Sequence, residues 1–191
     1  MSEEKLKLRA NNMLKEWFQD ANESELMMSI DEVLATPDAG KTIVQTIIDY
    51  SMDCKISELK LIIDLIMALH RNKKVSSSDI EVAMADIVEF IDSFACDNPQ
   101  VFHYVGEMFS VFVSEQILTF AWLCNCTSRV MGDDCKAKVI EEAMKSIKRT
   151  SGVGAIVSCF DLKGDRNSLE QLFGPAKVQE LSARMLPAAE A

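Results

Sequence analysis

Glycine and proline are scarce in this chain of 191 residues, which holds seven of the first and four of the second. With 48% apolar residues, this composition is typical of a globular protein and leans helical. No apolar run reaches the roughly 18 residues of a membrane-spanning helix, so no segment is expected to cross a bilayer. The opening MSEEKLKLRA is charged and lacks the apolar core of a secretory signal.

Histidine is rarer still, and the six cysteines do not occur at the spacing of a metal site. Cys124 and Cys126 form a C-x-C pair, but neither a second pair nor a suitably spaced histidine follows. Reduced, buried thiols are the expected state in a chain without a signal peptide. His70 and His103 have no Cys or Ser nucleophile at a telling spacing. We therefore expect no enzyme, no metal and no cofactor.

Basic residues are absent from a long central stretch, since no Lys or Arg occurs between Lys74 and Arg129. Residues 1–120 contain 21 acids and 10 bases, whereas residues 121–191 contain 9 acids and 10 bases. The net charge of −10 is therefore carried by the first part of the chain. Such a surface repels phosphate and attracts a basic protein, so direct nucleic-acid binding is not expected.

Apolar residues recur at helical spacing along most of the chain. Three helices are expected to begin at residue 5, at Asn22 and at Pro37. Three more are expected at 56–71, from Ser78 to about residue 92, and from Pro99 to 113. The last candidates cover 116–131, 133–150, 152–160, 166–173 and 175–186. No alternating strand pattern of useful length is present. We predict an all-α fold of about ten helices, an α-solenoid in which antiparallel helix pairs stack in a row.

Helix starts are predicted from a capping side chain followed by a glutamate or a proline. These starts are Asn22 with Glu25, Thr36 with Pro37, Ser78 with Glu81, and Asn98 with Pro99. Gly132 is expected to precede a helix that begins at Asp133. The expected breaks near the end of the chain are a loop at 161–167 and the pair Gly174–Pro175.

The acidic stretch FIDSFACDNPQVF, residues 90–102, interrupts two apolar helical patterns and has two interpretations. In the first, Asp97 or Asn98 caps the helix begun by Pro99, and the acids before it form a solvated face. In the second, Asp86, Glu89, Asp92 and Asp97 meet Arg or Lys side chains of a partner. Both can hold together, because a capping carboxylate keeps free lone pairs.

Residues 13–33 and 75–113 together resemble the MA-3 domain, a HEAT-like helical domain of translation initiation factor 4 gamma and of programmed cell death protein 4. Residues 13–33, MLKEWFQDANESELMMSIDEV, are similar to the opening pattern of the family, with Trp17 at its aromatic position. Residues 75–113 follow a later pattern, in which Asp97 and Pro99 fall on the Asp and Pro of the family element lDvP. The resemblance covers about residues 6–118.

The resemblance implies a HEAT-like stack in which 1–118 form the MA-3 domain and 119–191 a helical extension packed on it as one continuous unit. It implies a non-enzymatic, cytoplasmic and monomeric protein-interaction domain of a translation initiation scaffold. The implied partner is the DEAD-box RNA helicase of the initiation factor 4 complex, its A subunit. Family members bind it through the lDvP aspartate, here Asp97, and through an acid four residues earlier, where this chain has Ser93.

We therefore predict a docking site formed by Asp86, Glu89, Asp92, Asp97 and Pro99. Two alternatives remain open at this point. One is an inhibitor that resembles programmed cell death protein 4 and sequesters the same helicase. The other is a structural helical scaffold for a different partner.

Overall fold

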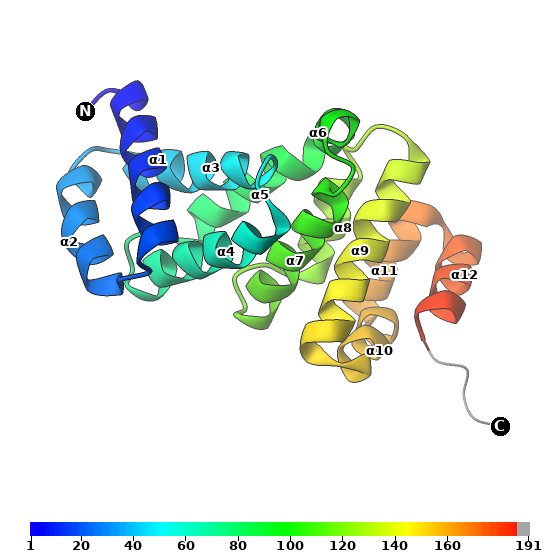
Figure 1. Ribbon diagram of the computed structural model, residues 1–191. Helices are drawn as coiled ribbons and strands as arrows, with labels where there is room; N and C mark the ends of the chain where they lie inside the picture. Colours follow the sequence, from blue (N-terminus) through cyan, green and yellow to red (C-terminus); the bar gives the residue numbers. More distant parts are fainter. Residues whose placement is uncertain (187–191) are drawn as a thin grey trace. The chain divides into compact units, whose positions relative to one another are not determined.

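The computed structural model describes residues 1–186, and its regular structure in that range is entirely helical (Figure 1). The helices are α1 (Glu3–Gln19), α2 (Glu23–Leu34), α3 (Ala39–Ser51), α4 (Ile56–Arg71), α5 (Ser77–Glu89), α6 (Ile91–Asp97), α7 (Val101–Ser114), α8 (Phe120–Thr127), α9 (Asp133–Ser151), α10 (Val153–Asp161), α11 (Lys163–Phe173) and α12 (Pro175–Met185). The all-α prediction is confirmed, with twelve helices in the described range where about ten were expected. No helix among residues 1–186 is long and apolar enough to cross a membrane.

The chain divides into two compact units, Met1–Ile87 and the residues from Val88 onward, so the division falls within α5. The boundary at residue 118 came from the family resemblance, and the assignment of 1–118 and 119–191 stays a prediction. Residues 187–191 of the expected extension lie outside the described residues.

In the first unit, α1 packs on α2, α3 and α4, and α3 also packs on α2 and α4. Helices that follow one another in the sequence are thus neighbours in space, as the helix-pair prediction required. The side chains that recur at helical spacing fill the core; among them are Leu14, Ile30, Ile43, Ile47, Ile62 and Ile66. A hydrogen bond also joins α1 to α4: the Trp17 indole Nε1–H donates to the Leu61 carbonyl at 2.9 Å.

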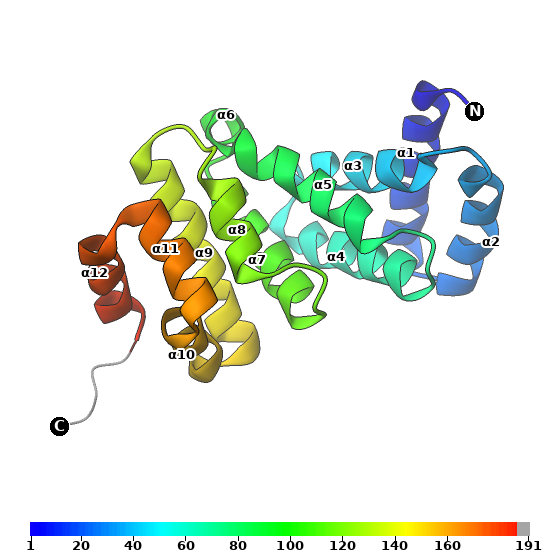
Figure 2. The same cartoon turned by 180° about the vertical axis from the view of Figure 1, so that it is seen from behind.

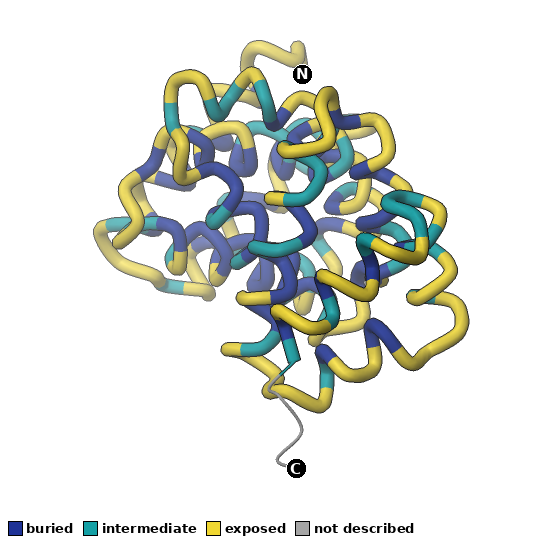
Figure 3. Tube along the Cα trace, turned by 90° about the vertical axis from the view of Figure 1, so that its right-hand side faces the viewer, coloured by how far each residue is buried: buried dark blue, intermediate teal, exposed yellow. Residues whose placement is uncertain are grey.

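In the second unit, α7 and α9 form the most extensive helix pair, and α6 packs on α7 while α8 and α10 pack on α9. Buried positions recur at the helical period along α7, α9 and α12, whereas α6 and α11 each bury one residue, Ile91 and Leu169. Buried and exposed stretches alternate along the chain (Figure 3). Gly106 allows α7 to approach α9 closely, since a Cβ there would lie 2.7 Å from the Glu142 carbonyl oxygen. Glu107 on α7 forms an ion pair with Arg149 on α9, and it also accepts a hydrogen bond from Ser146 Oγ at 2.6 Å. Close backbone contact and paired charges therefore hold α7 to α9.

Several predicted helix ends are confirmed. The Asn22 side chain accepts from the backbone N–H groups of Ser24 and Glu25, at 3.1 and 3.3 Å, and caps α2. Gly132, with φ of 82°, directly precedes α9. Gly174, with φ of 79°, ends α11, and Pro175 is the first residue of α12. Glycine is favoured at both breaks, because a residue with a Cβ is strained at a positive φ angle.

Three predicted starts are wrong by two residues. Pro37 lies in a turn, and α3 begins at Ala39 after Asp38, whose φ is 58°. Pro99 likewise lies in a turn before α7, which begins at Val101. The cap of α5 is Ser76 rather than Ser78: Ser76 Oγ accepts from the Asp79 N–H, and Asp79 accepts from the Ser76 N–H at 2.8 Å. Aspartate thus takes the place expected for Glu81, because its short side chain also reaches back to the cap.

The remaining corrections concern helix limits. The expected loop 161–167 is mostly helical, since only Leu162 separates α10 from α11. Arg166 and Glu170 form an ion pair across one turn of α11 at 2.9 Å, which favours the helix despite the polar composition. The single helix expected from Ser78 to about residue 92 breaks at Phe90 into α5 and α6. The helix expected at 116–131 contracts to Phe120–Thr127.

Candidate protein-docking site

The acidic stretch forms a short helix and a turn in the second unit, not an irregular bend (Figure 2). Ile91 is fully buried and fixes the start of α6 against the core. The turn into α7 is held by Asn98, whose Oδ1 accepts from the Gln100 N–H at 3.0 Å and whose carbonyl accepts from the Val101 N–H at 3.2 Å. Of the two capping candidates, Asn98 therefore supports the turn before α7.

Asp97 is the last residue of α6 and is exposed. Within residues 1–186, no hydrogen bond or ion pair engages its carboxylate. The negative end of the helix dipole lies at this terminus, where an acidic side chain is unfavourable. The Asp97 side chain thus makes no stabilising contact within the described residues, and its carboxylate is accessible to another molecule.

Glu89 is different, because it already has a cation. Its Oε2 lies 3.5 Å from Nη1 of Arg129, in the segment that follows α8. Arg129 is the first base after the base-free stretch, forty residues further along the chain, so local sequence reasoning did not find this pair. The pair neutralises Glu89 and leaves it less available to a partner.

The structure does not bring all five predicted site residues together. Asp92 is half-buried and Asp97 exposed on the same helix, and five residues at 100° each place them about 140° apart around its axis. Pro99 is exposed in the turn beside Asp97. Asp86 is exposed and belongs to the first unit. Asp97 and Pro99 are thus the adjoining pair, and the other three assignments stay predictions.

A groove of about 590 Å³ begins at Pro99 and runs between the start of α7 and α9. Its charged side chains already have partners: Lys138 Nζ lies 5.5 Å from the centre of the Phe102 ring, and Glu142 pairs with Lys145 at 2.6 Å. His103 Nδ1 lies 3.9 Å from Glu142 Oε2. This arrangement positions no nucleophile beside the histidine.

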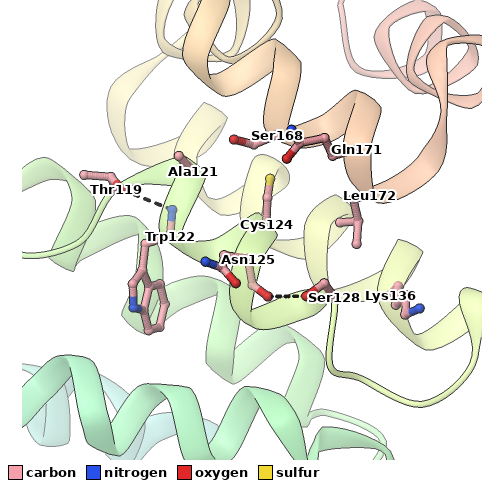
Figure 4. Close-up of a pocket in the computed structure, with 10 residues that line it drawn as sticks. All are labelled: Thr119, Ala121, Trp122, Cys124, Asn125, Ser128, Lys136, Ser168, Gln171 and Leu172. Atoms are coloured by element: carbon pink, nitrogen blue, oxygen red, sulfur yellow. Dashed lines mark hydrogen bonds between the residues drawn. The ribbon is translucent and has the colours of Figure 1, made fainter.

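A second hollow of about 700 Å³ lies between α8 and α11 (Figure 4). Cys124 points into it from α8 toward Ser168 and Gln171. Burial raises the pKa of the Cys124 thiol to about 12, so the thiolate needed for nucleophilic chemistry is scarce at neutral pH. In the described part of the chain, no group of three or more His, Cys, Asp or Glu side chains could hold a metal ion.

Comparison with known proteins gives one distant similarity. No protein-family model matches the chain. Over 120 residues, which make up 62% of this chain, it is 26% identical to "Eukaryotic translation initiation factor 4G" from Oryza sativa subsp. japonica. The chain is thus distantly similar to a translation initiation factor. The match spans 7% of the length of that relative, so it concerns one small region of a much larger protein.

Proposed function

We propose that this chain is a protein-interaction domain of an initiation factor 4 gamma-type scaffold, and that it docks the DEAD-box RNA helicase of the initiation factor 4 complex in the cytoplasm. The observation that carries the proposal is Asp97, an exposed acid without an internal partner at the end of α6. The distant similarity to initiation factor 4G and the MA-3-like pattern around Asp97 and Pro99 support the same function.

The charge of the chain favours a protein partner with a basic surface. The net charge is −10, and no base interrupts residues 75–128. Complementary charge raises the association rate and aligns the partners, and salt weakens both effects. The proposed domain therefore acts by binding and orientation, without a reaction of its own, a cofactor or direct contact with nucleic acid.

Titration of the purified helicase with the wild-type protein and with Asp97→Lys tests this proposal. If Asp97 meets a desolvated cation of the helicase, the substitution weakens binding by about 2 kcal/mol or more, a ~30-fold rise in Kd. The loss should shrink at high salt, because screening weakens the wild-type contact. Fluorescence anisotropy or calorimetry at two salt concentrations measures both effects.

Asp161→Lys is the matched control, since Asp161 is also an exposed aspartate at the last position of a helix in the same unit. Lysine at a helix C-terminus is favourable, so neither variant is expected to unfold. Equal affinity of Asp97→Lys, Asp161→Lys and wild-type protein would contradict the proposed site. Helicase ATPase measured with the wild-type protein separates the roles: stimulation fits a scaffold, and inhibition would favour the sequestering alternative.

A further inference from the structure

Phe90 occupies a position where the fold gains little from an aromatic ring. It lies between α5 and α6 and is 55% exposed. It is also the N-cap residue of α6, and its side chain makes no capping hydrogen bond. Ser, Asp and Asn are preferred at such a position, because their side-chain oxygens satisfy free N–H groups of the first turn. The Phe90 ring thus supplies neither a cap nor full burial at this junction.

The helix that follows places Phe90 and Asp97 on one side. Residues seven apart lie within about 20° of each other around a helix, so Phe90, Ser93 and Asp97 line one stripe of α6. Ser93 and Asp97 are exposed as well. At 1.5 Å per residue, the Cα atoms of Phe90 and Asp97 lie on the order of 10 Å apart along the axis. Asp92 lies on the other side, about 160° from Phe90.

A second exposed apolar side chain belongs to the segment next to Phe90. The ion pair of Glu89 and Arg129 ties the end of α5 to the residues after α8. Met131 follows Arg129 by two residues and is 72% exposed. This part of the second unit therefore combines exposed apolar groups with an unpaired acid, a pattern typical of interface anchors with charged rims.

We propose that Phe90 is the apolar anchor of the docking surface and that Asp97 is its charged end. The partner is a protein with a basic surface, in which an apolar depression receives the ring and an Arg or Lys about 10 Å away meets Asp97. The unpaired carboxylate of Asp97 favours this occupant. Two nearby bases do not compete for it, because Arg129 is paired with Glu89 and Lys145 with Glu142. This inference rests on the proposed function. It adds that the Phe90 ring supplies the part of the binding affinity that does not depend on salt.

The experiment compares Phe90→Ser with wild-type protein in the same helicase titration. Loss of a buried aromatic anchor should weaken binding about tenfold or more. That loss should be nearly the same at low and high salt, because apolar burial is not screened. The midpoint of thermal unfolding should stay unchanged or rise, since serine can cap α6.

Leu162→Ser is the matched control. Leu162 is 58% exposed, occupies the N-cap position of α11 and makes no capping hydrogen bond. It is followed directly by Lys163, and its junction lies near the end of α9, away from α6 (Figures 1 and 2). This variant should bind the helicase as wild-type protein does, with the same change in thermal midpoint as Phe90→Ser.

The outcomes separate this inference from the proposed function. If Asp97→Lys weakens binding and Phe90→Ser does not, the anchor is wrong and the docking function stands. If neither variant changes affinity, the proposed site fails together with the anchor. If the wild-type protein does not bind the helicase at all, the proposed function itself fails. A lowered thermal midpoint for Phe90→Ser but not for Leu162→Ser would show that the ring packs within the protein, and this too would overturn the anchor.

Discussion

Gly106 is the residue on which the close approach of α7 and α9 depends. An added Cβ would meet the Glu142 carbonyl oxygen at 2.7 Å and its carbonyl carbon at 2.9 Å. Both atoms belong to the backbone of α9, so relief requires the two helices to separate. We expect Gly106→Ala to lower the free energy of unfolding by about 1–3 kcal/mol, measured by urea denaturation.

Gly154→Ala provides the comparison for Gly106→Ala. Gly154 lies in α10, and a Cβ there would meet no atom within 4 Å. Alanine is favoured over glycine in helices by up to about 1 kcal/mol, so this change should be neutral or stabilising. Equal stability of the two variants would show that α7 and α9 are not in close contact at Gly106.

At the candidate site, local sequence patterns predict some features of single residues and not others. Asp97 is exposed, as the docking interpretation expected. The expectation that Asp97 or Asn98 caps the next helix is wrong, because the N-cap of α7 is Gln100, and Asn98 supports only the turn before it. The pairing of Glu89 with Arg129 could not be predicted, since it joins residues forty positions apart. The exposure of Phe90 could not be predicted either, because an aromatic residue between two apolar helical patterns is usually part of a core.

At the scale of helices, periodicity predicted where most elements lie but not where each begins. Apolar spacing determines which face is buried over several turns, so α1, α2, α4 and α9 were placed correctly to within about two residues. Starts depend on one or two side chains, and several residues near a start can cap. Ser76 and Ser78 could both cap α5. Ser76 is the cap because it exchanges two hydrogen bonds with Asp79.

Asp165 connects two helices and makes their packing dependent on pH. It lies on α11 and accepts a hydrogen bond from the Ala121 N–H in the first turn of α8. Burial raises the pKa of Asp165, and that hydrogen bond opposes the rise only in part. The folded protein therefore holds this proton more tightly than the unfolded chain. Its contribution to stability is fully present below the unfolded pKa of about 4 and falls as pH rises through the folded pKa.

Asp165→Asn removes this dependence, because asparagine carries no charge and its Oδ1 can still accept from Ala121. We expect the variant to be more stable than wild-type protein at pH 7, with the difference disappearing toward pH 4. Urea denaturation at the two pH values measures the change. A less stable Asp165→Asn at pH 7 would mean that the charged hydrogen bond outweighs the burial of the carboxylate.

For the whole molecule, the uneven charge and the distant similarity point to the same kind of role. Acids exceed bases only up to residue 120, and the candidate site lies in that part. The match to initiation factor 4G covers 120 residues of this chain and a small share of that relative. The proposed docking of a basic protein fits both observations.

The extent of the folding unit yields the last prediction, because the family resemblance ends at about residue 118. In the second unit, α7 packs on α9, and Phe109 on α7 stacks on Trp122 of α8 with ring centres 6.4 Å apart. A chain that ends at residue 118 would leave this side of α7 in water. We expect it to bind a hydrophobic dye and to lose cooperative thermal unfolding, whereas the full sequence unfolds cooperatively and does not bind the dye. Cooperative unfolding without dye binding in the shorter chain would instead show that residues 1–118 fold independently and that α8 to α12 only adjoin them.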